Sequence, residues 1–240
     1  RHRHSLGLRA LPVRQPRRTL GPLLRAFGED PALVESMETV VQGLQGRADG
    51  SDLDRGDKVL ATAKHYLGDG GTGTLLDHRH LHHRPGVTEV TREQLRDLHL
   101  APFRTAVERG VGTVMPSYSS LDIAGDGKGA VKMHARGDMI NGVLKDRLGF
   151  DGFVVSDWNA IDQLPGDYAA RVRTAVGAGV DMMMVPYSYK EFTATLTDEV
   201  KAGRISEDRL DDAVSRILTQ KFRLGLFEHP YADTSGAAAI

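Results

Sequence analysis

The alternation of apolar and polar positions along the chain predicts short strands separated by longer helices. The clearest strand lies in GFDGFVVSDW, residues 149–158, where a short apolar run ends abruptly at Ser156, Asp157 and Trp158. A run of this length, β-branched at its centre and bounded by glycines, is typical of a buried parallel strand. The same reasoning predicts further strands at 59–63, 112–116 and 181–185.

Apolar residues at helical spacing predict amphipathic helices around these strands. The first starts with a capping residue, Asp30, and with Pro31 in its first turn. The second opens on a capping box of Thr91 and Gln94 and contains Pro102, where we expect a kink. The expected helices are 30–46, 91–110, 136–148, 168–178, 189–202 and 206–222.

Strands and helices that alternate in this way, with short connections, predict an α/β fold with a parallel sheet. In such sheets and barrels, ligands bind at the carboxyl ends of the strands. Each expected strand delivers polar or aromatic residues to that edge. These residues are Lys64 and His65, Ser117 and Tyr118, Asp157 and Trp158, and Pro186 and Tyr187.

Asp157 has two interpretations on its own. A carboxylate at a strand end can act as a nucleophile or a base, and it can equally serve as the N-cap of the next helix. Four consecutive strand ends with the same character favour the functional interpretation, because an aromatic face and polar groups together suit a sugar ring.

Composition limits the possible partners. The chain has 240 residues, 40% of them hydrophobic, which is enough for a sizeable core. Its net charge of −1 and pI of about 6.9 favour neither a nucleic acid nor a membrane as partner. The absence of cysteine excludes disulfides and thiolate chemistry. Residues 1–18 are basic without an apolar segment behind them, so they do not resemble a signal peptide, and the compartment stays open.

Several motifs, in their order, resemble glycoside hydrolase family 3, and most closely its β-glucosidases and exo-β-glucanases. They are ATAKHY followed by GDGGT, then GVGTVMPSYSS, VKMHA, GFDGFVVSDW, AGVDMMMVP and GLFEHPYAD. The resemblance covers residues 26–233. It implies retaining hydrolysis of β-linked glucosides or gluco-oligosaccharides from the non-reducing end, without a metal or a cofactor. Asp157, in the SDW motif, matches the family's nucleophile, which forms a glycosyl-enzyme that water then hydrolyses.

The resemblance also assigns residues that bind the carbohydrate substrate. Lys64 and His65 would bind hydroxyls of the first sugar, and Met115 and Tyr118 would line its subsite. Trp158 would form one wall of the slot for the next sugar.

The chain also departs from the family pattern. We expect a partial (β/α)8 TIM-type barrel of about four βα units over 26–229, lacking the first strands, and a linker or tail at 230–240. The family's second domain, with the glutamate acid/base, has no counterpart, so this chain is expected to be a fragment with little activity. Gln163 stands near a position where the family often carries an arginine in the slot for the next sugar.

Two segments have unusual composition. Read one base over with GC-rich codons, TLGPLLR at 19–25 yields RWGRSYE, and LLDHRHLHHRPG at 75–86 yields SSTTGTYTIDQG. The first resembles the family's wording just before the first expected helix and the second an ordinary loop, and we hypothesise that 1–25 and 75–86 are out-of-frame translation rather than native structure. The histidine cluster in the second segment, which alternates with arginines, is therefore not a favoured metal site. Its members are His78, His80, His82 and His83.

Two other classes of function remain as alternatives. Gly68, Gly70 and Gly73, with Glu89 further on, fit the dinucleotide-binding pattern of an oxidoreductase, but 75–86 does not read as the helix that this pattern requires. The chain could also be a non-catalytic remnant or an interaction fragment, because an open half-barrel exposes strand edges and apolar surface.

Overall fold

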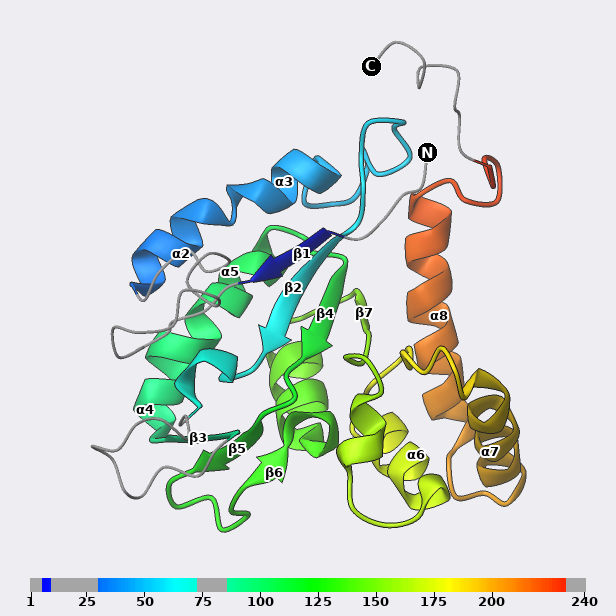
Figure 1. Ribbon diagram of the computed structural model, residues 1–240. Coiled ribbons are helices and arrows are strands. Elements are labelled where there is room, and N and C mark those ends of the chain that lie inside the picture. The colour runs from blue at the N-terminus through cyan, green and yellow to red at the C-terminus, as the bar shows by residue number, and fades with distance from the viewer. Residues whose placement is uncertain (1–5, 10–29, 73–85, 232–240) are drawn as a thin grey trace.

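A computed structural model describes residues 6–9, 30–72 and 86–231 (Figure 1). The main sheet is parallel, with the strand order β1-β2-β4-β7, and helices cover it. Within the described residues this parallel sheet does not close on itself, in agreement with the predicted partial barrel. The strands are β1 (Leu6–Arg9), β2 (Ala61–Tyr66), β3 (Val87–Val90), β4 (Thr113–Pro116), β5 (Ser120–Ile123), β6 (Val131–Lys132) and β7 (Phe153–Val154).

The α-helices follow the predicted order, and helices of 3-10 or π type lie between them. The α-helices are α2 (Pro31–Met37), α3 (Thr39–Gln45), α4 (Arg92–Gln94), α5 (Ala101–Glu108), α6 (Tyr168–Gly177), α7 (Tyr189–Lys201) and α8 (Glu207–Arg223). The other helices are η1 (Asp69–Gly71), η2 (Leu95–Leu100), η3 (Met133–Ala135), η4 (Asp138–Arg147) and η5 (Ala160–Gln163).

The strand expected at 181–185 is only partly confirmed. Met182 makes one parallel bridge with Val155, and the Asp181 and Met182 amides both donate to the carbonyl of Val154. Beyond this bridge the segment follows β7 without forming a continuous ladder. The apolar run thus lies beside β7, but pairing at a single bridge does not make it a regular strand.

The two faces of the sheet carry different side chains, because successive residues of a strand point to opposite faces. The outer face packs in the large core with the helices, through residues such as Ala63, Val114 and Val154. The inner face forms a smaller cluster with Met115, Phe153 and Val155 at its centre. Met182 and Met184 are only partly buried against this inner cluster.

The first expected helix is broken into two. Asp30 caps α2 by accepting from the Ala32 amide, as predicted, but the helix stops at Glu38 and α3 begins there. Glu38 is buried, with 2% of its surface exposed, and neither carboxylate oxygen has a hydrogen-bond partner within the described structure. Desolvation by this burial raises the pKa of Glu38 to about 8.

The helix expected at 91–110 is present, with the predicted capping box of Thr91 and Gln94. Its middle, η2, widens into a π-type helix just before Pro102. Proline has no backbone N–H and crowds the preceding turn, so a disturbance at this point is expected. The predicted kink thus takes the form of a local widening.

Glycines allow the chain to enter β7. Gly149 adopts a positive φ of 70° in the turn that precedes the strand. A Cβ at Gly152 would overlap the carbonyl oxygen of Gly112 at the start of β4. Gly149 therefore allows the turn before β7, and Gly152 allows β7 to approach β4 closely.

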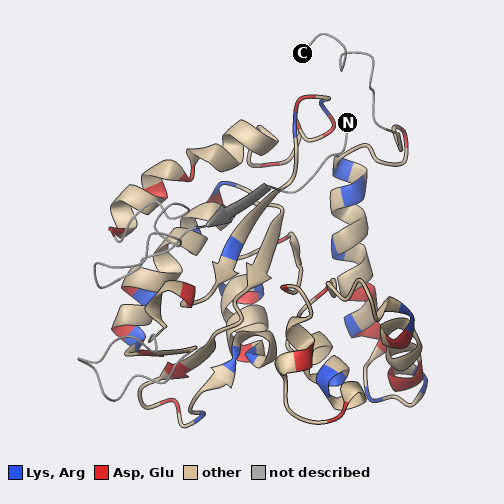
Figure 2. Ribbon diagram, viewed as in Figure 1, with Lys and Arg blue, Asp and Glu red and all other residues tan. Residues whose placement is uncertain are grey.

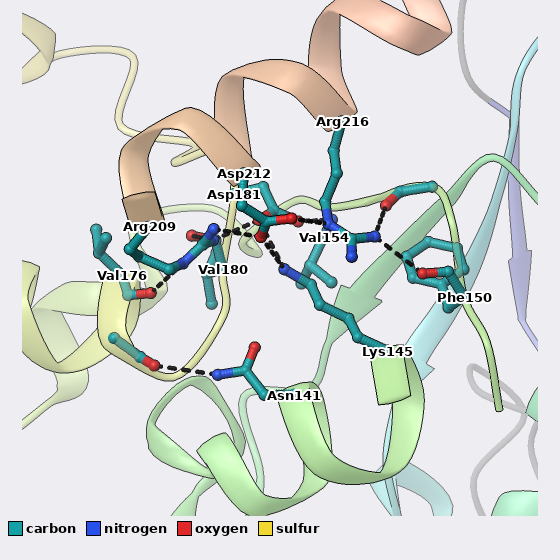
Figure 3. Close-up of polar contacts among 12 residues, drawn as sticks. Asn141, Lys145, Phe150, Val154, Val176, Val180, Asp181, Arg209, Asp212 and Arg216 are labelled. Atoms are coloured by element: carbon teal, nitrogen blue, oxygen red, sulfur yellow. Dashed lines mark hydrogen bonds and ion pairs between the residues drawn. The ribbon is translucent and has the colours of Figure 1, made fainter. Parts of the chain in front are cut away.

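A buried ionic cluster ties the amino ends of the strands to two helices (Figure 3). The Asp181 carboxylate binds the Lys145 ammonium at 2.8 Å and also contacts Arg209, and its other oxygen accepts from the Val154 amide at 2.7 Å. Arg216 of α8 donates to the Phe150 carbonyl, which precedes β7. The Asp181 side chain is fully buried, so the cluster is expected to be costly to break.

The Gln45 side chain also ties two strands of the sheet together, and we call this contact the Gln45 clamp. Its side-chain oxygen accepts from the Ala61 and Gly112 amides, at 2.8 and 3.0 Å, and its amide donates to the Gly110 carbonyl. One buried side chain thereby links the starts of β2 and β4 to the end of α3.

Most of the segments 1–25 and 75–86 lie outside the described residues, but Leu6–Arg9 forms β1, a strand that the sequence did not predict.

Acidic and basic residues are intermixed on the helices and loops, in keeping with the balanced charge (Figure 2). The helices of the described ranges include none with the length and apolar character needed to cross a membrane.

Candidate active site

The candidate site lies at the carboxyl end of the sheet, where the chain leaves β7. The Ser156 hydroxyl accepts from the Met184 amide at 2.7 Å, and the Asn159 amide donates to the Met184 carbonyl at 2.9 Å. Asn159 has a positive φ of 48°, a conformation that asparagine tolerates better than most residues. The turn that carries Asp157 and Trp158 is therefore fixed at both sides.

Asp157 is not a helix cap. The residue before η5 is Asn159, and α6 is capped by Asp167. One oxygen of the Asp157 carboxylate accepts from the Trp158 amide at 2.7 Å, and the other lies 3.3 Å from Nε2 of His65. The structure therefore removes the capping interpretation that the sequence had left open.

His134, which was not predicted as a site residue, contacts the backbone of Asp157. Its Nε2 accepts a hydrogen bond from the Asp157 amide at 3.1 Å, and the side chain is buried, with 1% exposed. Desolvation lowers the pKa of His134 to about 4, against the opposing effects of the Asp157 charge and a hydrogen bond to the Ser117 backbone. The imidazole is therefore neutral at pH 7 and can act as an acceptor toward Asp157.

His65 lies between two carboxylates. Its Nε2 faces Asp157, and its Nδ1 is 3.4 Å from Oδ2 of Asp69 in η1. The other oxygen of Asp69 accepts from the Ser117 hydroxyl at 3.0 Å. A continuous polar chain thus runs from the loop after β4 to Asp157.

Lys64 and Met115 are neighbours across the sheet. The register of β2 and β4 pairs Lys64 with Met115, and it shifts between Lys64 and Tyr66. An irregularity of this kind changes the alternation of side chains along a strand. Lys64 is half-buried, and Met115 packs in the inner cluster with Phe153 and Val155.

Aromatic side chains stand at the rim of the site. Trp158 is 48% exposed and meets Tyr187 edge to face, with 5.9 Å between ring centroids. The Tyr118 hydroxyl donates to the Trp158 carbonyl. Desolvation, and then the nearby charge of Asp157, raise the pKa of Tyr118 to about 12. Tyr118 therefore remains a hydrogen-bond donor at neutral pH.

Gln163 and Lys132 extend this rim. The Lys132 ammonium donates to the Tyr118 carbonyl and to the Gln163 side chain, both at 2.8 Å. The position where the resembling family often has an arginine is thus filled by a glutamine that a neighbouring lysine holds.

The structure brings together most of the residues that the sequence predicted. Contacts or strand register connect Lys64, His65, Met115, Tyr118, Asp157 and Trp158 at one edge of the sheet. Two residues of this site, His134 and Asp69, were not predicted from the sequence. They occur inside the motifs VKMHA and GDGGT, but neither stands directly after an expected strand.

The described ranges hold no group of histidine, cysteine, aspartate or glutamate side chains arranged to bind a metal ion. The cluster of His78, His80, His82 and His83 lies outside those ranges.

Comparisons with known proteins agree on one family. The model of the Glycosyl hydrolase family 3 N terminal domain matches residues 14–220. A β-xylosidase of Formosa agariphila is 34% identical over 220 residues, which are 87% of this chain and 28% of the relative. A lysosomal β-glucosidase of Dictyostelium discoideum is 32% identical over 224 residues, 90% of this chain and 26% of the relative.

A solved structure gives the same result. The exo-1,3/1,4-β-glucanase ExoP of a Pseudoalteromonas species is 37% identical, with a TM-score of 0.80 over 95% of this chain and 26% of that one. The chain spans between a quarter and a third of the length of these relatives. Since the family model matches well over half of the chain, the protein belongs to glycosyl hydrolase family 3, within the N-terminal domain of that family.

Proposed function

We propose that Asp157 is the nucleophile of a retaining β-glucosidase and that the surrounding residues form its sugar site. The position of its carboxylate carries the proposal. It lies at the carboxyl end of the sheet, fixed by the Trp158 amide, faced by His65 and beside exposed aromatic rings. Ligand sites of parallel α/β proteins lie at this edge, and a sugar ring packs well on an aromatic face.

In the proposed reaction, an oxygen of Asp157 attacks the anomeric carbon as the bond to the leaving-group oxygen breaks. The resulting ester between sugar and aspartate is then hydrolysed by water, which restores the carboxylate. The Asp157 carboxylate contacts His65, and sugar hydroxyls would share the donors of His65 and Lys64 on binding. Tyr118 and Met115 line the first sugar, and Trp158 forms a wall for the next one.

The role of proton donor is assigned to no described residue. Retaining glycosidases place the second carboxyl group about 5 Å from the nucleophile, on the side of the leaving group. The Asp69 carboxylate lies behind the His65 ring instead, bound to Ser117. We therefore expect that the chain hydrolyses substrates slowly when their leaving groups need protonation.

A substrate with an acidic leaving group separates these steps. Dinitrophenolate leaves without protonation, so a dinitrophenyl β-glucoside should give a rapid burst and a glucosyl adduct on Asp157, detected by peptide mass spectrometry. Asp157→Asn should abolish the burst and the adduct. Asp146→Asn, on an exposed residue of η4, is the matched control and should retain both. No adduct with the wild-type chain would favour the non-catalytic alternative.

The sugar itself needs a separate comparison, because the relatives include a β-xylosidase as well as a β-glucosidase. We propose the glucoside as the preferred substrate, as the motifs indicate. The matched xyloside differs only by lacking the hydroxymethyl group. A faster burst with the xyloside would contradict the preference while leaving the role of Asp157 in place.

The domain limits remain part of the proposal. We propose a barrel unit over 26–229, a tail at 230–240 and out-of-frame segments at 1–25 and 75–86. Resequencing the gene tests the frame: a shift of one base at both segments is expected, and a clean read of the present codons would contradict it.

A further inference from the structure

The His65 ring is held from the side opposite to Asp157. Asp69 Oδ2 lies 3.4 Å from Nδ1 of His65, and Asp157 Oδ2 lies 3.3 Å from Nε2. Both are at ion-pair distance, but Nδ1 is buried and makes no aligned hydrogen bond within the described structure. Polar contacts in unliganded active sites are often long and tighten when a ligand binds.

Asp69 is itself firmly placed. Its second oxygen accepts from the Ser117 hydroxyl, which in turn accepts from the Ser119 amide at 3.0 Å. The loop backbone just before it is fixed as well, because the Thr88 hydroxyl donates to the Gly68 carbonyl. A side chain anchored in this way can impose an orientation on the ring it faces.

We propose that Asp69 is a positioning residue for His65, and this inference rests on the proposed function. A carboxylate only accepts hydrogen bonds, so Asp69 favours a proton on Nδ1, just as Asp157 favours one on Nε2, and Asp69 fixes the plane of the ring. The Nε2 edge is then directed toward Asp157 and the bound sugar. Second-layer groups of this kind orient first-layer ligands in many sites.

Ring-nitrogen NMR tests the inference without any turnover. The full chain is labelled with ¹⁵N-histidine, and the His65 signals are identified by their loss in His65→Gln. In the wild type, Nδ1 of His65 should carry a proton. In Asp69→Ala the His65 signals should move toward the other tautomer. Asp69→Asn, which keeps the volume and an acceptor oxygen, should move them less, and Ser117→Ala should have the smallest effect. Asp146→Asn should leave them unchanged.

Glucose binding by titration is the second readout. Asp69→Ala should weaken binding by about tenfold, the size expected when a hydrogen bond to a charged group is lost. Unfolding temperature, measured for each variant, identifies any that fail to fold, in which case Asp69→Asn and Ser117→Ala carry the test.

The possible results separate the two proposals. His65 signals that stay the same in Asp69→Ala and Asp69→Asn would overturn the role of Asp69, even if glucose binds. If the wild-type chain does not bind glucose but the His65 signals change in the Asp69 variants, the result would count against the sugar site and in favour of the positioning role.

Discussion

Nε2 of His134 accepts a hydrogen bond from the backbone amide of Asp157, 3.1 Å away. The bond requires an unprotonated Nε2, and burial keeps the ring neutral. The geometry at the candidate nucleophile is therefore linked to the protonation of a residue that never needs to touch substrate.

Acid should destabilise the protein through His134. Its pKa is lowered from 6.5 to about 4 by burial, so the neutral ring contributes stability that is complete above pH 6.5 and lost as the pH falls through 4. The loss should reach roughly 3 kcal/mol for this group. His99 should add a similar loss, because burial also lowers its pKa to about 4. Urea unfolding at several pH values between 7 and 4 measures how steeply the free energy of unfolding falls with pH, which is the slope to compare. His134→Gln should reduce it, and an unchanged slope would contradict the assignment.

Alkali should act through Glu38. Its pKa is raised from 4.5 to about 8, so its protonated form contributes stability that is complete below pH 4.5 and lost as the pH rises through 8. The expected loss is roughly 5 kcal/mol. Glu38→Gln should remove this pH dependence and make the protein more stable at pH 8. Glu108→Gln, on an exposed residue of α5, is the control and should leave the dependence in place. The measurement is the free energy of unfolding as a function of pH, from urea unfolding. The same pH dependence in wild type and in Glu38→Gln would refute the prediction.

Asp181→Asn should be strongly destabilising, by about 3 kcal/mol, because it removes the nearer carboxylate from the buried Lys145 ammonium and leaves only the Asp212 carboxylate, at 3.5 Å. Chemical denaturation of the variant measures the loss. Asp146→Asn, an exposed carboxylate on the same helix as Lys145, should change stability by less than about 0.5 kcal/mol. Equal midpoints for the two variants would show that the cluster adds nothing to stability.

Gln45→Leu tests the clamp between β2 and β4. Leucine fills a similar volume but leaves the Ala61 and Gly112 amides without acceptors, at a cost of about 2–3 kcal/mol. Hydrogen exchange should speed up at these two amides more than elsewhere in the sheet. Gln42→Leu, on the same helix and bound only to Arg109 among the described side chains, is the control. Exchange that rises equally in both variants would argue against the clamp.

Candidate residues at strand ends could be predicted from the sequence, but the residues that hold them in place could not. Asp157, His65 and Tyr118 stand at or near strand ends, and strand ends can be recognised from local apolar runs. His134 contacts Asp157, 23 residues away, and Asp69 is anchored by Ser117, 48 residues away; local periodicity gives no signal for contacts at these separations.

Errors in the expected elements have similar causes. The helix at 30–46 has helical spacing throughout, yet it breaks at Glu38, where the carboxyl group is buried. The run at 181–185 is as apolar as a strand, but it forms a single bridge with β7. In both cases tertiary packing decides what local propensity leaves open.

The inner face of the sheet gives the protein an unexpected chemical sensitivity. The chain has no cysteine, but Met182 and Met184 are only partly buried beside the turn that holds Asp157. Oxidation would convert these flexible thioethers into polar sulfoxides on an apolar surface. Damage by peroxide would thus reach the apolar surface next to the proposed nucleophile, and methionine sulfoxide reductases could reverse it.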